Sequence, residues 1–164
     1  MGRSRGGLST KVHQLVDGNG RPLVILAGPG QANDSPLLPW LLDGLCVPRL
    51  GPGRPRTRPD ALVADKAYCS AAHRRALRAR GIKVVIPERA DQITNRKRKG
   101  NRGGRPPTFD AATYRDRNVV ERSFNTHKQW RGLATRYDKH VNHYRAAHVL
   151  SAIITWLDAM GDTP

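Results

Sequence analysis

Four side chains that could act together on a phosphodiester recur at helical spacing in the C-terminal half of the chain: Tyr114, Arg117, Glu121 and Lys128. Their intervals of three, four and seven residues would place them on one face of a single helix. That face would carry a ring, a guanidinium, a carboxylate and an ammonium group, whereas a face packed on a core is apolar. The structural alternative is a solvated face with ion pairs, such as Arg117 with Glu121, each contributing only about 0.3–0.5 kcal/mol.

A second carboxylate that could do chemistry is Asp65, which follows the short apolar run 61–64. That run is typical of a buried strand, so we expect the aspartate at the carboxyl end of the strand. A strand-end carboxylate paired with one on a later helix can bind Mg²⁺ for phosphoryl transfer, because Mg²⁺ prefers hard oxygen ligands. Asp65 and Glu121 are therefore candidate catalytic and metal-binding residues. The structural alternative for Asp65 is a helix cap or an aspartate at the entry to a loop.

The charge of the chain points to a polyanionic partner. Its 164 residues include 29 Lys and Arg against 13 Asp and Glu, so the formal net charge is +16. Many of the bases lie in two segments rich in Gly and Pro, 48–59 and 89–108, which we expect to be flexible basic loops. The stretch from Gln92 to Phe109 contains no acidic residue. Four consecutive bases within it are candidate DNA-binding residues: Arg96, Lys97, Arg98 and Lys99.

Several classes of protein and site are disfavoured. No apolar run approaches the roughly 20 residues of a membrane-spanning helix, and no signal peptide is evident, so we expect a cytoplasmic protein without a membrane partner. Cys46 and Cys69 lack neighbours at metal-ligand spacing and are expected to be small buried side chains. His140 and His143 are interpreted as surface or DNA-facing polar residues, and His127 is expected to face DNA.

Local patterns predict the elements that must position these residues. Two runs rich in Val, Leu and Ile, 10–16 and 22–27, flank Asp17-Gly18-Asn19-Gly20, which predicts a β-hairpin. Strands are expected over 61–64 and 83–86, and helices over 35–45, 70–80, 110–130 and 142–160. The first of these helices is rich in leucine and should be largely buried. Strands that alternate with helices, together with a hairpin, indicate an α/β chain with a mixed sheet flanked by helices.

At these residues the sequence resembles a known family. The pattern Tyr-x₂-Arg-x₃-Glu-x₆-Lys is the signature of bacterial insertion-sequence transposases of the DDE type. Three further segments, 2–11, 64–68 and 134–139, are similar to the insertion-sequence-five group of the insertion-sequence-four-like superfamily. The resemblance covers nearly the whole chain.

The resemblance implies an RNase H-like core in which three acidic residues hold two Mg²⁺ ions. Asp65 matches the second acid and Glu121 the third, while Tyr114, Arg117 and Lys128 would support the site and contact the transposon-end DNA. The implied reaction is DNA transposition, in which activated water cuts a phosphodiester and the freed 3′-hydroxyl attacks target DNA. The implied partners are transposon-end and target DNA and a homo-oligomer, with the protein associated with the nucleoid when bound.

One acid of the family pattern has no match here. In the family the first aspartate lies on the first strand, upstream of the segment that matches 2–7. We therefore expect 1–164 to be a partial RNase H-like domain, truncated at its N-terminus and lacking its first strand and first acid. Asp17 and Asp34 are poor substitutes because both fall in turns. The chain alone is then expected to be inactive, either as a decayed fragment or as a second-frame product that joins an upstream-frame portion of the transposase.

Two other classes of function remain open from the sequence. In a non-catalytic basic DNA-binding protein, the basic segments would account for the function, and DNA binding would survive Asp65→Ala and Glu121→Ala. In a ribosomal-type RNA binder, the same small basic α/β chain would recognise RNA. The absence of an aromatic-rich RNA-binding strand, and three tryptophans that look placed for packing, disfavour the RNA class.

Overall fold

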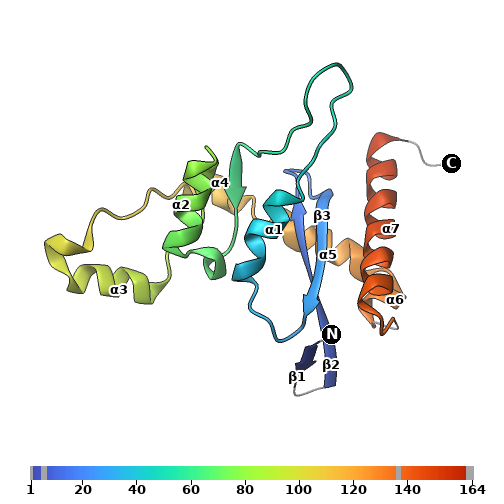
Figure 1. The fold of residues 1–164 in the computed structure, drawn as a ribbon, viewed down its shortest axis with the longest axis horizontal. Helices are drawn as coiled ribbons and strands as arrows, with labels where there is room; N and C mark the ends of the chain where they lie inside the picture. The colour runs from blue at the N-terminus through green and yellow to red at the C-terminus, as the bar shows by residue number, and fades with distance from the viewer. Residues whose placement is uncertain (1, 5–6, 136–137, 162–164) are drawn as a thin grey trace. The chain divides into compact units, whose positions relative to one another are not determined.

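The computed structural model describes residues 2–4, 7–135 and 138–161. Its elements form two compact units (Figure 1). Unit 1 comprises Met1–Thr57 and Asn118–Pro164, and unit 2 comprises Arg58–Arg117. Within the segments that carry the family resemblance, Arg5, Gly6, Arg136 and Tyr137 lie outside the described residues.

Unit 1 is built on a three-stranded antiparallel sheet with the order β1–β2–β3 (Figure 1). The strands are β1 Gly2–Ser4, β2 Gly7–Val16 and β3 Pro22–Pro29. The pairing of β2 with β3 confirms the predicted hairpin, and its register sets Leu15 opposite Val24. Alternation of apolar and polar residues along the two strands turns one set of side chains towards a core.

Five helical segments belong to the same unit: η1 Ser35–Leu37, α1 Leu38–Asp43, α5 Asn118–Lys128, α6 Arg131–Ala134 and α7 Val141–Met160. Leu41 of α1 and Leu45 just after it pack with Val24 of β3 in a buried cluster. Helix α7 packs along β3, and α5 contacts both β2 and α7. The prediction of a helix over 142–160 is therefore confirmed to within one residue.

Unit 2 contains a β–α–β unit whose two strands are parallel. Its strands are β4 Ala61–Val63 and β5 Lys83–Val85, and the connection contains η2 Lys66–Tyr68 and α2 Ala71–Ala79. The hydroxyl of Ser70 accepts a hydrogen bond of 3.1 Å from the His73 amide and so caps the helix that the sequence predicted over 70–80. After α2 the chain turns at Gly81, whose φ of +68° favours glycine.

A buried arginine fixes the end of β5, and sequence reasoning did not single it out. Arg74 of α2 is 6% exposed and donates through Nη2 to the carbonyl oxygen of Ile86 at 2.7 Å and of Pro87 at 3.3 Å. Burial lowers the pKa of Arg74 from its ordinary value. The remaining elements of unit 2 are α3 Ala90–Arg98, η3 Gly100–Gly103 and α4 Ala111–Arg115.

The α/β class is confirmed, whereas the arrangement of the strands differs from the prediction. We expected one mixed sheet, and the described strands instead form two sheets, an antiparallel one in unit 1 and a parallel one in unit 2. Strand direction follows from local connections, because a tight turn makes a hairpin and a helical crossover makes a parallel pair. Which strands become neighbours depends on packing between elements distant in the sequence.

The segment 89–108, expected to be a flexible loop, contains α3 and η3. The guanidinium of Arg96 pairs with the carboxylate of Glu88, which ties the last turn of α3 to the residues before the helix. Arg89 pairs with Asp91 at 2.8 Å in the first turn. Bases in the last turn also suit the negative end of the helix dipole. Only the segment after η3, rich in Gly and Pro, follows the prediction of a loop.

The burial of three predicted packing residues also differs. Trp40 is 68% exposed, Trp130 is 44% exposed and Cys46 is exposed, although Leu41 beside Trp40 is 3% exposed and belongs to the core. Cys69 is buried as expected. Among the described helices, including the 20-residue α7, none combines the length and apolar character that a membrane crossing requires.

Candidate functional site

Asp65 lies close to where the sequence predicted, two residues beyond the carboxyl end of β4 and directly before η2. Its strand is held by parallel pairing with β5, in which Leu62 lies opposite Val84. The side chain is exposed and caps η2, because its Oδ1 atom accepts a hydrogen bond of 2.7 Å from the Ala67 amide. The capping role considered from the sequence is therefore present, and Oδ2 takes no part in that bond.

Tyr114 and Arg117 form one aromatic and cationic group in unit 2. The ring of Tyr114 lies 5.2 Å from that of Phe109, centroid to centroid, and the guanidinium of Arg117 lies 5.8 Å from the centroid of the Tyr114 ring. A guanidinium in this position is attracted by the face of the ring. The arrangement holds a positive charge beside an aromatic side chain, a combination suited to a nucleic-acid backbone or base.

The helix that carries Tyr114 is tied to β5 by an ion pair. Asp110 caps α4 by accepting hydrogen bonds from the amide and hydroxyl of Thr113, and its Oδ2 atom lies 2.8 Å from Nζ of Lys83. The ammonium group of Lys83 first, and then the bonds from Thr113, hold the pKa of Asp110 well below its usual range. Asp110 therefore stays ionised and keeps α4 attached to the end of the sheet.

The single helix predicted over 110–130 is wrong, because it is broken at residues 116–117. Helix α4 ends at Arg115 and α5 begins at Asn118. The amides of Asp116 and Arg117 bond to the carbonyls three residues earlier, at 3.3 and 3.1 Å, which tightens the last turn and ends α4. The four-residue stripe is consequently divided between units: Tyr114 and Arg117 belong to unit 2, and Glu121 and Lys128 belong to unit 1.

Glu121 lies in the first turn of α5, where a carboxylate suits the positive end of the helix dipole. Its side chain is exposed, as is that of Lys128 in the last turn of the same helix. Near the start of α5, the hairpin turn approaches closely at Gly20. Gly20 has a φ of +85°, and an added Cβ would lie 3.2 Å from the carbonyl oxygen of Val119, so a side chain here would strain the backbone and crowd that carbonyl.

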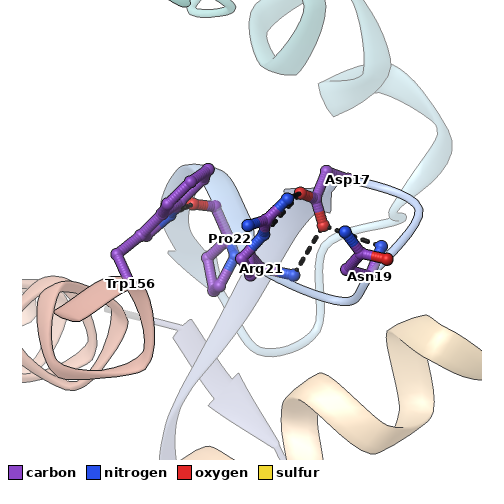
Figure 2. A network of polar contacts seen from close by, with 5 residues as sticks. All are labelled: Asp17, Asn19, Arg21, Pro22 and Trp156. Carbon is purple, nitrogen blue, oxygen red and sulfur yellow. Dashed lines mark hydrogen bonds and ion pairs between the residues drawn. The ribbon is translucent and has the colours of Figure 1, made fainter. Parts of the chain in front are cut away.

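Asp17, which the sequence disfavoured as a metal ligand, lies in the turn between β2 and β3 and is bonded within it. Its Oδ1 atom accepts from the amides of Asn19 and Arg21, each at 2.9 Å, and its Oδ2 atom accepts from Nε of Arg21 at 2.7 Å (Figure 2). Both oxygens are therefore engaged in stabilising the hairpin. Asp34, the other weak candidate, pairs with Lys11 at 2.6 Å.

His127, which we expected to face DNA, is buried in unit 1. It is 1% exposed, its Nδ1 atom lies 2.8 Å from the hydroxyl of Ser151, and its Nε2 atom lies 3.1 Å from Oε1 of Gln14. These contacts join α5 to α7 and to β2, so the histidine positions the helix that carries Glu121. A signal existed in the sequence: Ser123 and His127 are one turn apart and share the buried face of α5.

The four consecutive basic residues, three at the end of α3 and Lys99 just after it, differ in whether their charge is paired. Arg96 is half-buried and paired with Glu88, an acid that lies just outside the acid-free stretch on which the prediction relied. The side chains of Lys97, Arg98 and Lys99 are exposed, and no described contact engages their charged ends. Three of the four predicted DNA-binding charges are thus presented to solvent.

The segment 48–59 follows its prediction as an exposed loop without helix or strand (Figure 1). Its base is pinned by an isolated bridge, in which the amide of Val47 donates to the carbonyl of Arg56 at 2.9 Å and the reverse bond measures 2.8 Å. Arg49 and Arg54 lie in the part of the loop that the bridge closes, and both are exposed. The bridge therefore presents a small group of guanidinium charges from one short loop.

The donor set of the candidate metal site is made of carboxylates, which suit Mg²⁺. Among residues 2–4, 7–135 and 138–161, three or more His, Cys, Asp or Glu side chains nowhere gather into a potential metal site. A pair of carboxylates still fits Mg²⁺, because this ion is commonly held by one or two carboxylates together with waters and substrate phosphates. Asp65 meets that requirement with an oxygen that its capping bond does not use.

Comparison with known proteins agrees with the sequence resemblance. Residues 2–157 match the family model described as "Transposase DDE domain". The chain is 30% identical over 150 residues to a protein named as a transposase for insertion sequence element IS6501 of Brucella ovis, a match that covers 92% of this chain and 99% of the relative. It is 41% identical over 80 residues to a protein named as a transposase for insertion sequence element IS402 of Burkholderia cepacia.

The second of these matches is partial, because it covers 49% of this chain and 38% of the relative. No solved structure matches the chain. The sequence matches thus extend over the hairpin and α5 of unit 1 and over the whole of unit 2.

Proposed function

The chain belongs to the transposase DDE domain family, and on that premise we propose that it acts as the DNA transposase of an insertion sequence, cutting and joining phosphodiester bonds. The observation that carries the proposal is the placement of Asp65, an exposed carboxylate at the end of a strand whose pairing with β5 holds it in position. Glu121, in the first turn of α5, supplies the second carboxylate.

We assign Asp65 and Glu121 as the residues that would hold Mg²⁺, with DNA phosphates completing the ligand set. When bound, Mg²⁺ polarises a phosphoryl oxygen and lowers the pKa of bound water. The contribution of the protein is to hold two hard anionic oxygens at fixed points, one by a strand end and a capping bond, the other by the first turn of an anchored helix. Because two carboxylates alone bind Mg²⁺ with low affinity, metal binding should depend on the presence of DNA.

The basic residues would bind the DNA backbone. Lys97, Arg98 and Lys99 are exposed at the end of α3. Each phosphate that such a residue neutralises releases counterions, so affinity should fall steeply with salt. Arg117 and Tyr114 supply a cation stacked on a ring, and Lys128 supplies a further exposed charge on α5. We propose that all three contact the transposon-end DNA.

We also propose that the domain is of the RNase H-like type. The antiparallel hairpin β2–β3, followed along the chain by the parallel β4–α2–β5 unit, supports this assignment through strand direction and element order. The family resemblance implies the same fold.

The experiment is a nicking assay on DNA that carries the ends of the element, with Mg²⁺ present or chelated. The sequence alone predicts an inactive chain, because the first acid of the family pattern has no match. With DNA phosphates completing the ligand set, we instead expect Mg²⁺-dependent nicking that is lost in Asp65→Asn and in Glu121→Gln. Asp158→Asn is the matched control, because it removes an exposed carboxylate from α7 with the same change of charge. Nicking by the Asp65→Asn variant at the wild-type rate would overturn the assignment of Asp65.

A second readout separates metal binding from turnover. Fe²⁺ bound in place of Mg²⁺ reduces added hydrogen peroxide to hydroxyl radicals that cleave the nearby backbone, with ascorbate regenerating Fe²⁺. Cuts near residues 65 and 121 that require DNA would support the assigned ligands. If DNA binds equally well to the wild type and to both variants, with neither nicking nor iron-directed cuts, the chain acts as a non-catalytic DNA-binding protein instead.

A further inference from the structure

One face of α7 is apolar and exposed although the helix is anchored to unit 1 by its other side. The buried residues of the helix are His148, Ser151 and Ala152. The exposed apolar residues are large, with exposed fractions of 60% for Leu150, 49% for Ile153, 40% for Ile154, 38% for Leu157 and 64% for Met160. Single exposed apolar residues are ordinary, whereas a continuous row of them marks a contact surface.

The spacing along this face is that of a helix that packs against another helix. Six exposed residues alternate at intervals of three and four: His143, Ala146, Leu150, Ile153, Leu157 and Met160. We call this row the α7 seam. Such spacing keeps a stripe of side chains facing a partner helix over successive turns, with each side chain fitting between those of the partner. From His143 to Met160 the seam is about 25 Å long.

The charge of the α7 seam restricts its partner. None of its six residues is acidic or basic apart from His143, and the positions that flank it carry Ala147, Val149, Ile154 and Trp156. This neutral surface lies on a chain with a net charge of +16. Nucleic acid and acidic proteins gain nothing from an uncharged apolar row, because their attraction to this chain acts through its basic residues.

We propose that the α7 seam pairs with the α7 seam of a second copy of this chain, the two helices running antiparallel about a two-fold axis. In this pairing Leu150 lies opposite the partner's Ile153, and Ala146 lies opposite the partner's Leu157. A large side chain thereby faces a small one in each outer layer, and two branched side chains meet at the centre. The seam is its own complement when reversed, which is the requirement of a two-fold contact.

Two physical terms favour this arrangement over other pairings of the same surface. Antiparallel helices set the positive end of one dipole beside the negative end of the other. The neutral seam also lets two strongly cationic chains approach without placing like charges in contact. The pairing does not rest on the catalytic assignment, because none of its residues belongs to the candidate metal site and the central residues of the seam, from Ala146 to Leu157, have no predicted role in DNA binding.

The first test is analytical ultracentrifugation of the nuclease-treated chain at about 100 μM and about 0.5 M salt, a concentration suited to a short, micromolar interface. High salt removes association through bound DNA and leaves an apolar contact intact. We expect a dimer that becomes a monomer in Leu150→Glu and in Ile153→Glu. Ala159→Glu, which adds the same charge at an exposed position off the seam, should remain a dimer.

The second test fixes orientation by disulfide trapping, with Cys46→Ser in every variant. An equimolar mixture of Ala146→Cys and Leu157→Cys proteins should form a covalent dimer on mild oxidation, since the antiparallel pairing sets these two positions opposite each other. Either protein oxidised alone should not, because 146 and its own copy would be about 16 Å apart along the helices.

Four results would overturn the proposal. A wild-type chain that remains monomeric under these conditions shows that the seam does not pair with itself. Dimers that survive both glutamate substitutions place the interface elsewhere. Efficient trapping of the Ala146→Cys protein with itself shows a parallel pairing, and assemblies larger than a dimer show a contact that does not close.

Discussion

The rings of His127 and His148 meet nearly edge to face in the interior of unit 1, with their centroids 5.2 Å apart and their planes at 72°. His127 comes from α5 and His148 from α7. His127 has hydrogen-bond partners at both ring nitrogens, in Ser151 and Gln14. Neither ring nitrogen of His148 has a partner among the described residues, and its ring packs edge-on against Tyr144 at 4.8 Å. Two titratable groups thus join the helices that position Glu121.

This pair should make unit 1 sensitive to acid. Burial and then the neighbouring His127 lower the pKa of His148 to about 4, and burial lowers the pKa of His127 as well. An unfolded histidine titrates near pH 6.5, so the unfolded chain binds more protons below that pH. The free energy of unfolding is therefore highest above about pH 6.5 and decreases as the pH falls towards 4. The decrease due to His148 is at most about 3 kcal/mol.

Urea unfolding followed by circular dichroism at pH 7 and at pH 4.5 measures this loss. His148→Phe, which keeps an aromatic ring and cannot be protonated, should reduce the difference between the two pH values. His143→Gln removes an exposed histidine from the same helix and should leave the difference unchanged. An identical pH dependence in all three proteins would refute the assignment to His148.

The structural and catalytic roles of Asp65 can be separated by substitution. Asp65→Asn retains an oxygen that can accept from the Ala67 amide, so the free energy of unfolding should stay within about 0.5 kcal/mol of the wild type. Asp65→Ala removes the cap and should cost about 1 kcal/mol. Both variants should lose nicking. Thermal unfolding and nicking measured on the same preparations check the prediction, which fails if activity declines only in the less stable variant.

Of the four consecutive basic residues at the end of α3, three should contribute to DNA affinity and one to the stability of the helix. Replacing Lys97, Arg98 and Lys99 together by alanine should lower the slope of log affinity against log salt by about 2–3, since each neutralised phosphate contributes about 0.9. Arg96→Ala should act mainly on the stability of α3, because it leaves the half-buried carboxylate of Glu88 without its partner. Fluorescence anisotropy with labelled DNA across a salt series, together with helix content, distinguishes the two effects.

The indole of Trp156 should contribute measurably to the free energy of unfolding through its contact with the hairpin. Trp156 donates through Nε1 to the carbonyl oxygen of Pro22 at 2.8 Å, and the guanidinium of Arg21 lies 4.5 Å from the centroid of its ring (Figure 2). Trp156→Phe keeps a ring and loses the hydrogen bond, so it should lower the free energy of unfolding by about 1 kcal/mol. Trp40→Phe changes an exposed tryptophan in the same way and should stay within about 0.5 kcal/mol.

Elements with local signals were predictable from the sequence. The hairpin follows from Asp17-Gly18-Asn19-Gly20, and α2 follows from the cap at Ser70 and the turn at Gly81. In each case the interaction that defines the element joins residues within four positions of one another. The family could also be identified from the sequence, because its signature consists of residue types at fixed intervals.

Long-range contacts explain where the predictions differed from the structure. The sequence of 110–130 keeps a helical period throughout, yet the helix is interrupted at residues 116–117. Helix α4 is attached to β5 through Lys83, whereas α5 is attached to β2 and α7 through His127. Two halves of a helix with different attachments need not stay continuous. A contact outside the local segment also explains the difference at Arg96. The sequence predicted that it binds DNA together with the three bases that follow it, whereas its charge is paired with Glu88, which lies outside the basic run.

The sequence by itself determined the hairpin, α2 and the net charge, and it identified Asp65 and Glu121 as candidate carboxylates, since these depend on residue identity and near-neighbour spacing. Only the tertiary structure decided which side chains of each helix are buried: His127 within the unit, Leu150 and Ile153 at its surface. Helical periodicity defines faces without stating which of them meets the rest of the molecule. That choice depends on packing between elements that lie far apart in the chain.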